Sequence, residues 1–173
     1  MRIARRFAVV VAALFICTLA SVANAQGLTL GTGASTPDAV SLIYDPATGN
    51  LSMDSGSVSV TTLEVKSAGG MFNAEAANKN GDFVPPFDVA SAAKLFRLTT
   101  NGVNSLNFND GVLPTGLSAD ALLADLSVNG SIKPSGGLGN APGGGPYLYV
   151  VPEPSSILLA ACGLLGVLGL RRK

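Results

Sequence analysis

Residues 40–54 read VSLIYDPATGNLSMD, and this stretch predicts a β-hairpin that sets the fold class of the chain. Val40 to Tyr44 favours a strand, and Leu51 to Asp54 resumes the strand pattern after a turn. Within the turn, Pro46 presets φ, and Gly49-Asn50 accommodates positive φ. The central region is therefore expected to begin with two antiparallel strands.

The chain beyond the hairpin continues in short apolar or alternating runs that turn residues separate. Val58 and Val60 share one parity whereas Leu63 and Val65 share the other, so one regular strand cannot bury all four. A β-bulge at Thr61-Thr62 resolves this conflict. Further strands are expected at Lys94–Thr100, Val103–Phe108 and Leu126–Val128.

Two local motifs predict connections. Asn101-Gly102 is typical of a tight hairpin turn. Ser118 is placed to cap a helical turn that runs through Asp120 to Leu123. Roughly seven or eight short strands and one short helix indicate a mainly β fold, an antiparallel β-sandwich ectodomain over residues 26–134.

The N-terminal segment 1–25 has the three parts of a secretory signal peptide. A basic stretch precedes the 13-residue apolar run Phe7–Leu19, and Ala23 and Ala25 supply the small residues that signal peptidase reads. Cleavage is expected between Ala25 and Gln26. A permanent anchor is the alternative, but 13 residues reach only about 20 Å, short of a ~30 Å hydrocarbon core.

The C-terminal segment 151–173 contains Pro152, Glu153 and Pro154, then the apolar run 157–170 and a terminal Arg171-Arg172-Lys173. The prolines keep the chain around Glu153 extended and accessible. The apolar run predicts a short transmembrane helix, and the three cations form a cytoplasmic stop. Because this run is only about 21 Å long as a helix, its membrane anchoring is expected to be transient.

Gly and Pro dominate residues 135–150, which are interpreted as a flexible linker between the ectodomain and the C-terminal segment. Such a tether would expose the chain around Pro152 to an enzyme.

The motif Pro152-Glu153-Pro154, with its apolar run, basic terminus and paired signal peptide, resembles the PEP-CTERM sorting signal that exosortases recognise. The resemblance implies that an exosortase-type membrane enzyme cuts near these residues and releases the ectodomain to the cell surface or extracellular matrix. These residues are then substrate and not catalyst. The alternative is an ordinary tail anchor with an incidental Pro-rich stretch.

Two further stretches, YDPATGN at 44–50 and GVLPTGLSAD at 111–120, resemble short β-sandwich ectodomains found among PEP-CTERM proteins, some of them cohesin-like. This resemblance implies no catalytic residue.

Charge and composition narrow the chemistry of the central region. Five basic residues face ten acidic residues there, a net charge of 5 − 10 = −5, which argues against nucleic-acid binding. The chain has no His, and its two Cys, Cys17 and Cys162, lie in the terminal apolar runs. A Ser-His-Asp triad, a Cys-His dyad and the usual zinc site are thus excluded from the ectodomain.

Carboxylates remain as candidates for chemistry. Glu64 and Glu75 are a conceivable glycosidase-type pair, but most acids lie in turns, so no enzyme and no catalytic residue is expected. Calcium is the better alternative, because hard oxygen ligands suit a secreted domain without disulfides. The weak candidate ligands are Asn78, Asn80, Asp82 and Asp110. They lie in two loops, 78–82 and 107–111, and neither loop has the spacing of a twelve-residue calcium loop. No other cofactor is expected.

The sequence therefore predicts an exported envelope or matrix protein with a structural or interaction role. The expected partners are signal peptidase, an exosortase-type enzyme, the membrane as a transient anchor, and exopolysaccharide. A secreted carbohydrate- or calcium-binding β-sandwich is the alternative.

Overall fold

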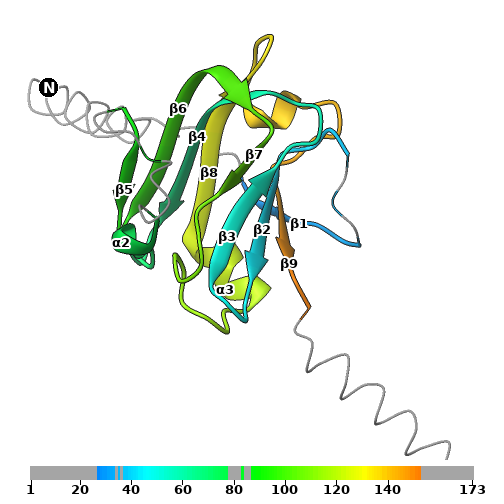
Figure 1. Ribbon diagram of the computed structural model, residues 1–173. Coiled ribbons are helices and arrows are strands. Elements are labelled where there is room, and N and C mark those ends of the chain that lie inside the picture. Colours follow the sequence, from blue (N-terminus) through cyan, green and yellow to red (C-terminus); the bar gives the residue numbers. More distant parts are fainter. Residues whose placement is uncertain (1–26, 34, 36, 78–82, 84–86, 153–173) are drawn as a thin grey trace, which may run out of the picture.

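The computed structural model describes residues 27–33, 35, 37–77, 83 and 87–152. The described residues form two β-sheets (Figure 1) that share one hydrophobic core. The first has the order β1 (Thr29–Leu30), β9 (Tyr147–Val150), β2 (Ser41–Asp45), β3 (Asn50–Asp54), β7 (Ser105–Asn107). The second has the order β5 (Val89–Ser91), β6 (Lys94–Val103), β4 (Val60–Ser67), β8 (Leu126–Ile132). This mainly β, two-sheet architecture agrees with the predicted sandwich.

The predicted hairpin is present as β2 and β3, which pair antiparallel with Tyr44 opposite Leu51. Leu42 and Tyr44 of β2, and Leu51 and Met53 of β3, are fully buried, whereas the residues between them are only partly so. This alternation follows from the two-residue period of a strand, which sends every second side chain into the core.

The predicted β-bulge is also present, in the middle of the second sheet. The register of β4 shifts between Val60 and Thr62 against both of its neighbours, β6 and β8. The shift lets Val60, Leu63 and Val65 all lie buried despite their opposite parities.

The prediction of a flexible linker over 135–150 does not agree with the structure. Residues 138–140 form a 3-10 helix whose Leu138 is fully buried, and residues 147–150 form β9. Strand β9 lies between β1 and β2, with Leu148 opposite both Leu30 and Leu42. The folded domain therefore extends through Val150, and its last strand is an interior strand of the first sheet.

Strand β9 also corrects the antiparallel prediction, because it runs parallel to both β1 and β2. The other strand pairs are antiparallel among the described residues. The parallel arrangement joins segments more than 100 residues apart for β2 and β9, and such a long-range pairing leaves no mark in the local sequence pattern.

Asn101-Gly102 is not a hairpin turn, contrary to the prediction. Both residues lie inside β6, and Gly102 takes a φ of +77° beside the Ser59 side chain. The chain then crosses to the other sheet, where Ser105–Asn107 pairs with β3 instead of returning along β6. The sequence predicts that Gly102 forms a turn, whereas in the structure this glycine lets strand β6 pass close to the Ser59 side chain.

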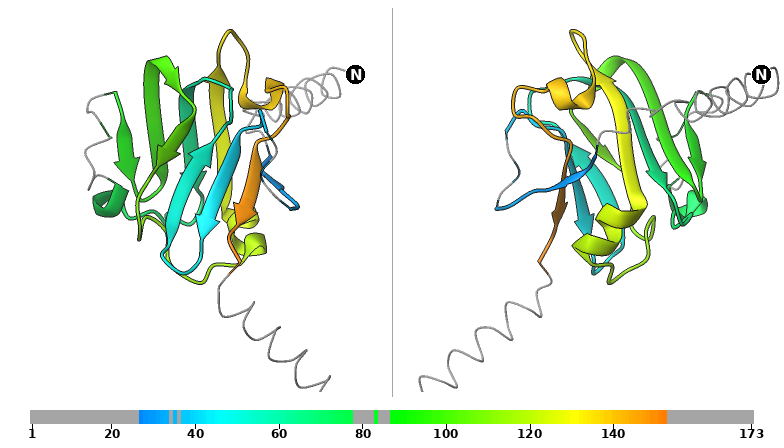
Figure 2. Two further views of the ribbon diagram at one scale, coloured as in Figure 1. Left: turned by 45° about the vertical axis from the view of Figure 1, so that its right-hand side comes forward. Right: turned by 180° about the vertical axis from the view of Figure 1, so that it is seen from behind.

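Two short helices complete the described part. Helix α2 (Ala74–Ala77) begins after Asn73, whose side chain accepts from the Glu75 and Ala76 N–H groups. Helix α3 (Ala119–Asp125) begins at the predicted cap, where Ser118 Oγ accepts from Ala121 N at 3.2 Å. Helix α3 lies beside the end of β9, as the two views of Figure 2 show.

None of the helices in the described ranges is long and apolar enough to cross a membrane. The predicted signal peptide 1–25 and the predicted transmembrane helix 157–170 lie outside the described residues.

The loop before β2 is fixed to the turn after β3 by a carboxylate. Asp38, at a φ of +60°, accepts hydrogen bonds from the backbone N–H and the hydroxyl of Ser57. These donors stabilise the charged form, so they lower the pKa of Asp38 below its ordinary value.

Because the pKa of Asp38 is lower in the folded state, its contribution is present above the unfolded pKa of about 3.9. It is lost as the pH falls through the folded pKa. Asp38→Ala should therefore lower the urea midpoint of unfolding at pH 7, and the difference from the parent should shrink at more acidic pH. A difference that stays constant down to about pH 2, below the ordinary Asp pKa, would contradict this account.

Candidate functional site

The C-terminal segment leaves the folded domain directly at the end of β9. Val150 is the last residue of the strand, and the next residue, Val151, still donates from its N–H to the Tyr44 carbonyl at 2.9 Å. Pro152, the first residue of the predicted processing motif, follows directly and is exposed. The motif thus begins where the sheet ends.

Tyr44 connects this exit to a second segment of the chain. Its side chain is fully buried, and its hydroxyl donates to the Pro114 carbonyl at 2.6 Å and accepts from the Leu117 N–H at 3.1 Å. One residue therefore holds the last strand through its backbone and the 114–117 loop through its side chain. The sequence analysis did not single out Tyr44; the available signal was a tyrosine in a buried strand, whose hydroxyl needs a partner.

Backbone hydrogen bonds fasten the same loop to the β2–β3 turn. The N–H groups of Gly111, Leu113 and Gly116 donate to the carbonyls of Thr48, Gly49 and Pro46 at 2.9, 3.0 and 2.9 Å. Gly49 has a φ of +69°, and a Cβ there would lie 2.2 Å from the Leu113 carbonyl oxygen. Only glycine fits both the turn and this close approach.

We call residues 44–50, 109–118 and 151 the exit pole. It brings together most of the two stretches, 44–50 and 111–120, that the sequence analysis marked for their resemblance to ectodomains of PEP-CTERM proteins. They are far apart in sequence, yet the structure makes them one hydrogen-bonded surface around the exit of β9.

The exit pole is acidic. Asp45 lies at the end of β2, Asp110 in the loop, and Asp120 just beyond it in the first turn of α3. The described cations have other partners: Lys66 and Lys94 pair with Glu64, Arg97 pairs with Asp88, and Lys133 contacts the Asn101 carbonyl. The surface around the tail exit therefore carries negative charge that is not paired with a cation of the described residues.

Tyr44→Phe should lower the free energy of unfolding by about 1–2 kcal/mol, because it leaves the Pro114 carbonyl and the Leu117 N–H without their partner. Faster proteolytic nicking within 113–117 should accompany this loss. Urea unfolding and limited proteolysis measure the two effects. Unchanged values for both would show that the hydroxyl does not hold the loop.

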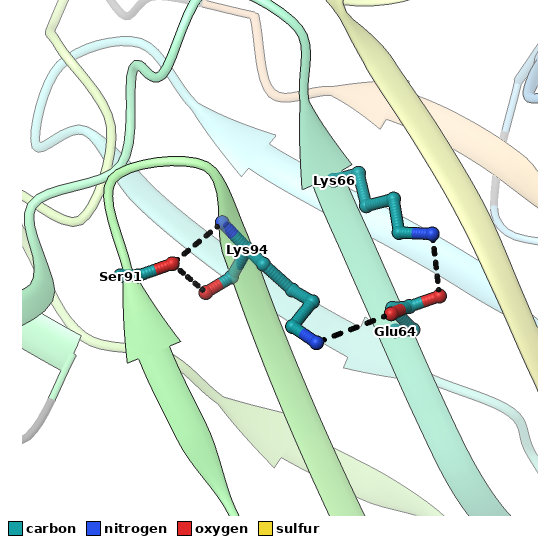
Figure 3. Close-up of polar contacts among 4 residues, drawn as sticks. All are labelled: Glu64, Lys66, Ser91 and Lys94. Atoms are coloured by element: carbon teal, nitrogen blue, oxygen red, sulfur yellow. Dashed lines mark hydrogen bonds and ion pairs between the residues drawn. The ribbon is translucent and has the colours of Figure 1, made fainter.

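A second polar cluster lies on the outer face of the four-stranded sheet (Figure 3). The Glu64 carboxylate lies between the ammonium groups of Lys66, at 3.0 Å, and Lys94, at 3.6 Å. The Ser91 hydroxyl binds the backbone of Lys94 across the β5–β6 turn. The Lys94 ammonium also lies 5.6 Å from the centroid of the Phe96 ring. Glu64 is thus engaged in ion pairs, the role that a solvated surface carboxylate usually has.

Beside this cluster is a shallow hollow of about 200 Å³. Its lining combines an aromatic ring with hydroxyl, amide and carboxylate groups, from Thr62, Glu64, Phe96, Asn129, Gly130 and Ser131. The Thr61 and Thr62 hydroxyls each hydrogen-bond to the Ser131 hydroxyl at the bulge.

The candidate calcium ligands are only partly within the described residues. Asp110 is exposed and accepts from the Asn50 amide at 2.9 Å, while Asn78, Asn80 and Asp82 lie outside the described ranges. Within 27–33, 35, 37–77, 83 and 87–152, no three or more acidic, His or Cys side chains gather as they would around a metal ion. The structure therefore gives Asp110 a contact with Asn50, and the prediction that it binds calcium with Asn78, Asn80 and Asp82 falls outside the described residues.

The predicted processing residues lie mostly outside the described part of the chain. Pro152 is described; Ala23, Ala25, Gln26, Glu153, Pro154, Arg171, Arg172 and Lys173 are not. Glu64 and Glu75, the conceivable carboxylate pair, lie on β4 and α2, respectively.

The comparisons with known proteins identify the C-terminal segment. Residues 150–173 match the family of PEP-CTERM protein-sorting motifs. No curated protein and no solved structure matches the chain. The motif supports the predicted sorting signal, and the cohesin-like character of the ectodomain stays a prediction.

Proposed function

We propose that the chain is an exported cell-surface or matrix protein whose tail is processed by an exosortase-type membrane enzyme, and that its β-sandwich has a structural or interaction role. A signal peptide over 1–25, a transient anchor over 157–170 and a basic stop at Arg171, Arg172 and Lys173 complete this route. The observation that carries the proposal is the match of residues 150–173 to a protein-sorting motif.

The fold gives this proposal a physical basis. The matched segment begins at Val150, the last residue of β9, so the sheet and the motif meet without intervening sequence. The ectodomain on the other side of this boundary is a complete two-sheet unit with its own core. Cutting after the sheet would therefore release a folded domain.

A non-enzymatic role agrees with the chemistry of the side chains. The chain lacks histidine, and both cysteines lie in the terminal apolar runs. Of the acidic residues, Glu64 is held in two ion pairs, Asp88 in one, and Asp125 is bound by the Ser67 hydroxyl and the Gly69 N–H. These carboxylates have structural partners that account for their positions.

Replacing Pro152, Glu153 and Pro154 together by alanine tests the proposal. We expect the variant to accumulate as a membrane-bound chain that keeps its C-terminus, while the parent loses it. Immunoblotting of membrane and surface fractions with a tag after Lys173 and another within the exposed 133–135 loop measures both ends. Replacing the exposed Pro142 by alanine, outside the motif, is the matched control. Equal processing of the triple variant and the parent would refute the assignment of this segment.

A carbohydrate-binding role for the outer face is the second candidate. The hollow beside Phe96 combines an aromatic ring with hydroxyl, amide and carboxylate groups, the kinds of group that contact sugar rings and their hydroxyls. A glycan array tests it, with Phe96→Ala as the comparison variant. Sharp binding to one sugar class that Phe96→Ala abolishes supports a saccharide site; no binding by the parent leaves the structural role.

A further inference from the structure

We infer that the exit pole is a docking surface for the extracytoplasmic face of the membrane enzyme that processes the tail. This inference rests on the proposed function, and it assigns to that function a recognition surface outside the tail. The folded ectodomain would then contribute to substrate recognition, beyond the Pro-Glu-Pro motif.

The first argument is the length of chain between the fold and the membrane. Val151 is still hydrogen-bonded to β2, and the expected apolar run begins at Ile157. Six residue steps of at most about 3.5 Å allow roughly 20 Å, even for a fully extended chain. An enzyme that binds the segment around Glu153 must therefore accommodate the folded domain beside it, and the part of the domain closest to it is the exit pole.

The second argument is that this pole is preorganised. Three backbone hydrogen bonds join the 109–118 loop to the β2–β3 turn, and the buried Tyr44 hydroxyl adds two more. The Asn50 amide bridges the Asn107 and Asp110 side chains, each at 2.9 Å. A surface already held in one conformation loses little entropy on binding, which favours it as a contact for another protein.

The third argument concerns the kind of partner. Asp45 and Asp110 give the pole negative charge, and Asp120 adds to it from just beyond the 109–118 loop. Anionic lipid headgroups repel this charge. The same carboxylates suit a protein surface that presents cationic or hydrogen-bond-donating groups. Charge thus favours the enzyme over the lipid surface as the occupant.

The test combines a bulky, positively charged substitution at the exit pole with a longer connection between the folded domain and the tail. Thr115 is exposed between Pro114 and Gly116, both of which make hydrogen bonds that fix the loop. Thr115→Arg places size and positive charge on the proposed contact. Ser135→Arg makes a similar change at an exposed position in the loop after β8, at the end of the molecule away from α3 (Figure 1).

Each variant is expressed as the full chain, both at the native spacing and with eight Gly/Ser residues inserted between Val151 and Pro152. The rate of tail loss is followed by pulse-chase, and thermal unfolding confirms that each ectodomain folds. We expect Thr115→Arg to slow processing about tenfold at the native spacing, the effect of losing about 1.4 kcal/mol of contact. The linker should remove most of this difference, and Ser135→Arg should match the parent in both contexts.

Two outcomes would overturn the inference. Processing of Thr115→Arg at the parental rate would show that the pole makes no contact. A defect of equal size with and without the linker would show that the substitution acts through folding or export, because a flexible linker frees the pole from the enzyme without repairing either. Absence of tail loss in the parent chain would instead refute the proposed function itself.

Discussion

Replacing Leu148 by alanine is expected to lower the free energy of unfolding by about 2–5 kcal/mol, the cost of a cavity at a fully buried leucine. Leu148 lies opposite Leu30 on one side and Leu42 on the other, so the cavity would open in the middle of the first sheet. A loss of this size is a large part of the stability of a small domain. Urea unfolding followed by circular dichroism measures it.

Leu148→Met is the matched control, because it nearly conserves volume and should cost less than about 1.5 kcal/mol. A flexible linker over 135–150 would make both substitutions nearly neutral. The contrast between the two variants therefore tests whether β9 belongs to the core.

Replacing Asp88 by alanine is expected to cost about 2–4 kcal/mol, because it leaves a largely buried cation without its counter-charge. The carboxylate is almost fully buried; one oxygen accepts from the Leu98 N–H at 2.8 Å, and the other lies 3.6 Å from Arg97 Nη1. Arg97 Nε and Nη1 have no hydrogen-bond partner among the described residues, so the ion pair is their main compensation. Urea unfolding again measures the loss.

Asp88→Asn separates the two contributions, since its amide oxygen can still accept from the Leu98 N–H but carries no charge. We expect it to fall between the parent and Asp88→Ala. The effect should persist at 1 M salt, because a buried pair is screened much less than a surface pair. A loss of stability that vanishes at 1 M salt would show that solvent screens the Asp88–Arg97 pair as it screens a surface pair.

The sequence was most informative where the deciding interactions are local. The β2–β3 hairpin follows from Pro46 and Gly49 between two strand-forming runs, and the bulge follows from the parity change between Val60 and Leu63. Ser118 predicted the start of α3 because a helix cap depends on a few neighbouring residues. Each of these features is fixed by residues that lie close together in the sequence.

Features that depend on distant partners were not predicted. Strand β9 buries Leu148 and is composed of strand-favouring residues, but the surrounding Gly and Pro residues suggested a linker. The position of β9 between β1 and β2 depends on pairing with residues at the other end of the domain. The exit pole was not predicted for the same reason, since Tyr44 contacts Pro114 only after the sheets assemble.

The hydrogen bond from Val151 to the sheet limits where the tail can be cut without damage to the fold. A cut within 147–150 would remove part of β9 from the sheet, and a cut between Val150 and Val151 would remove the hydrogen bond from the Val151 N–H to Tyr44, whereas a cut after Val151 leaves both intact. The stable product should therefore keep residues 147–151.

Intact-mass spectrometry of the protein recovered from the cell surface and the medium tests the sorting account most directly. The account predicts a chain that begins at Gln26 and whose C-terminus lies after Val151 and before the apolar run at Ile157. Surface protein that still ends at Lys173 would contradict it.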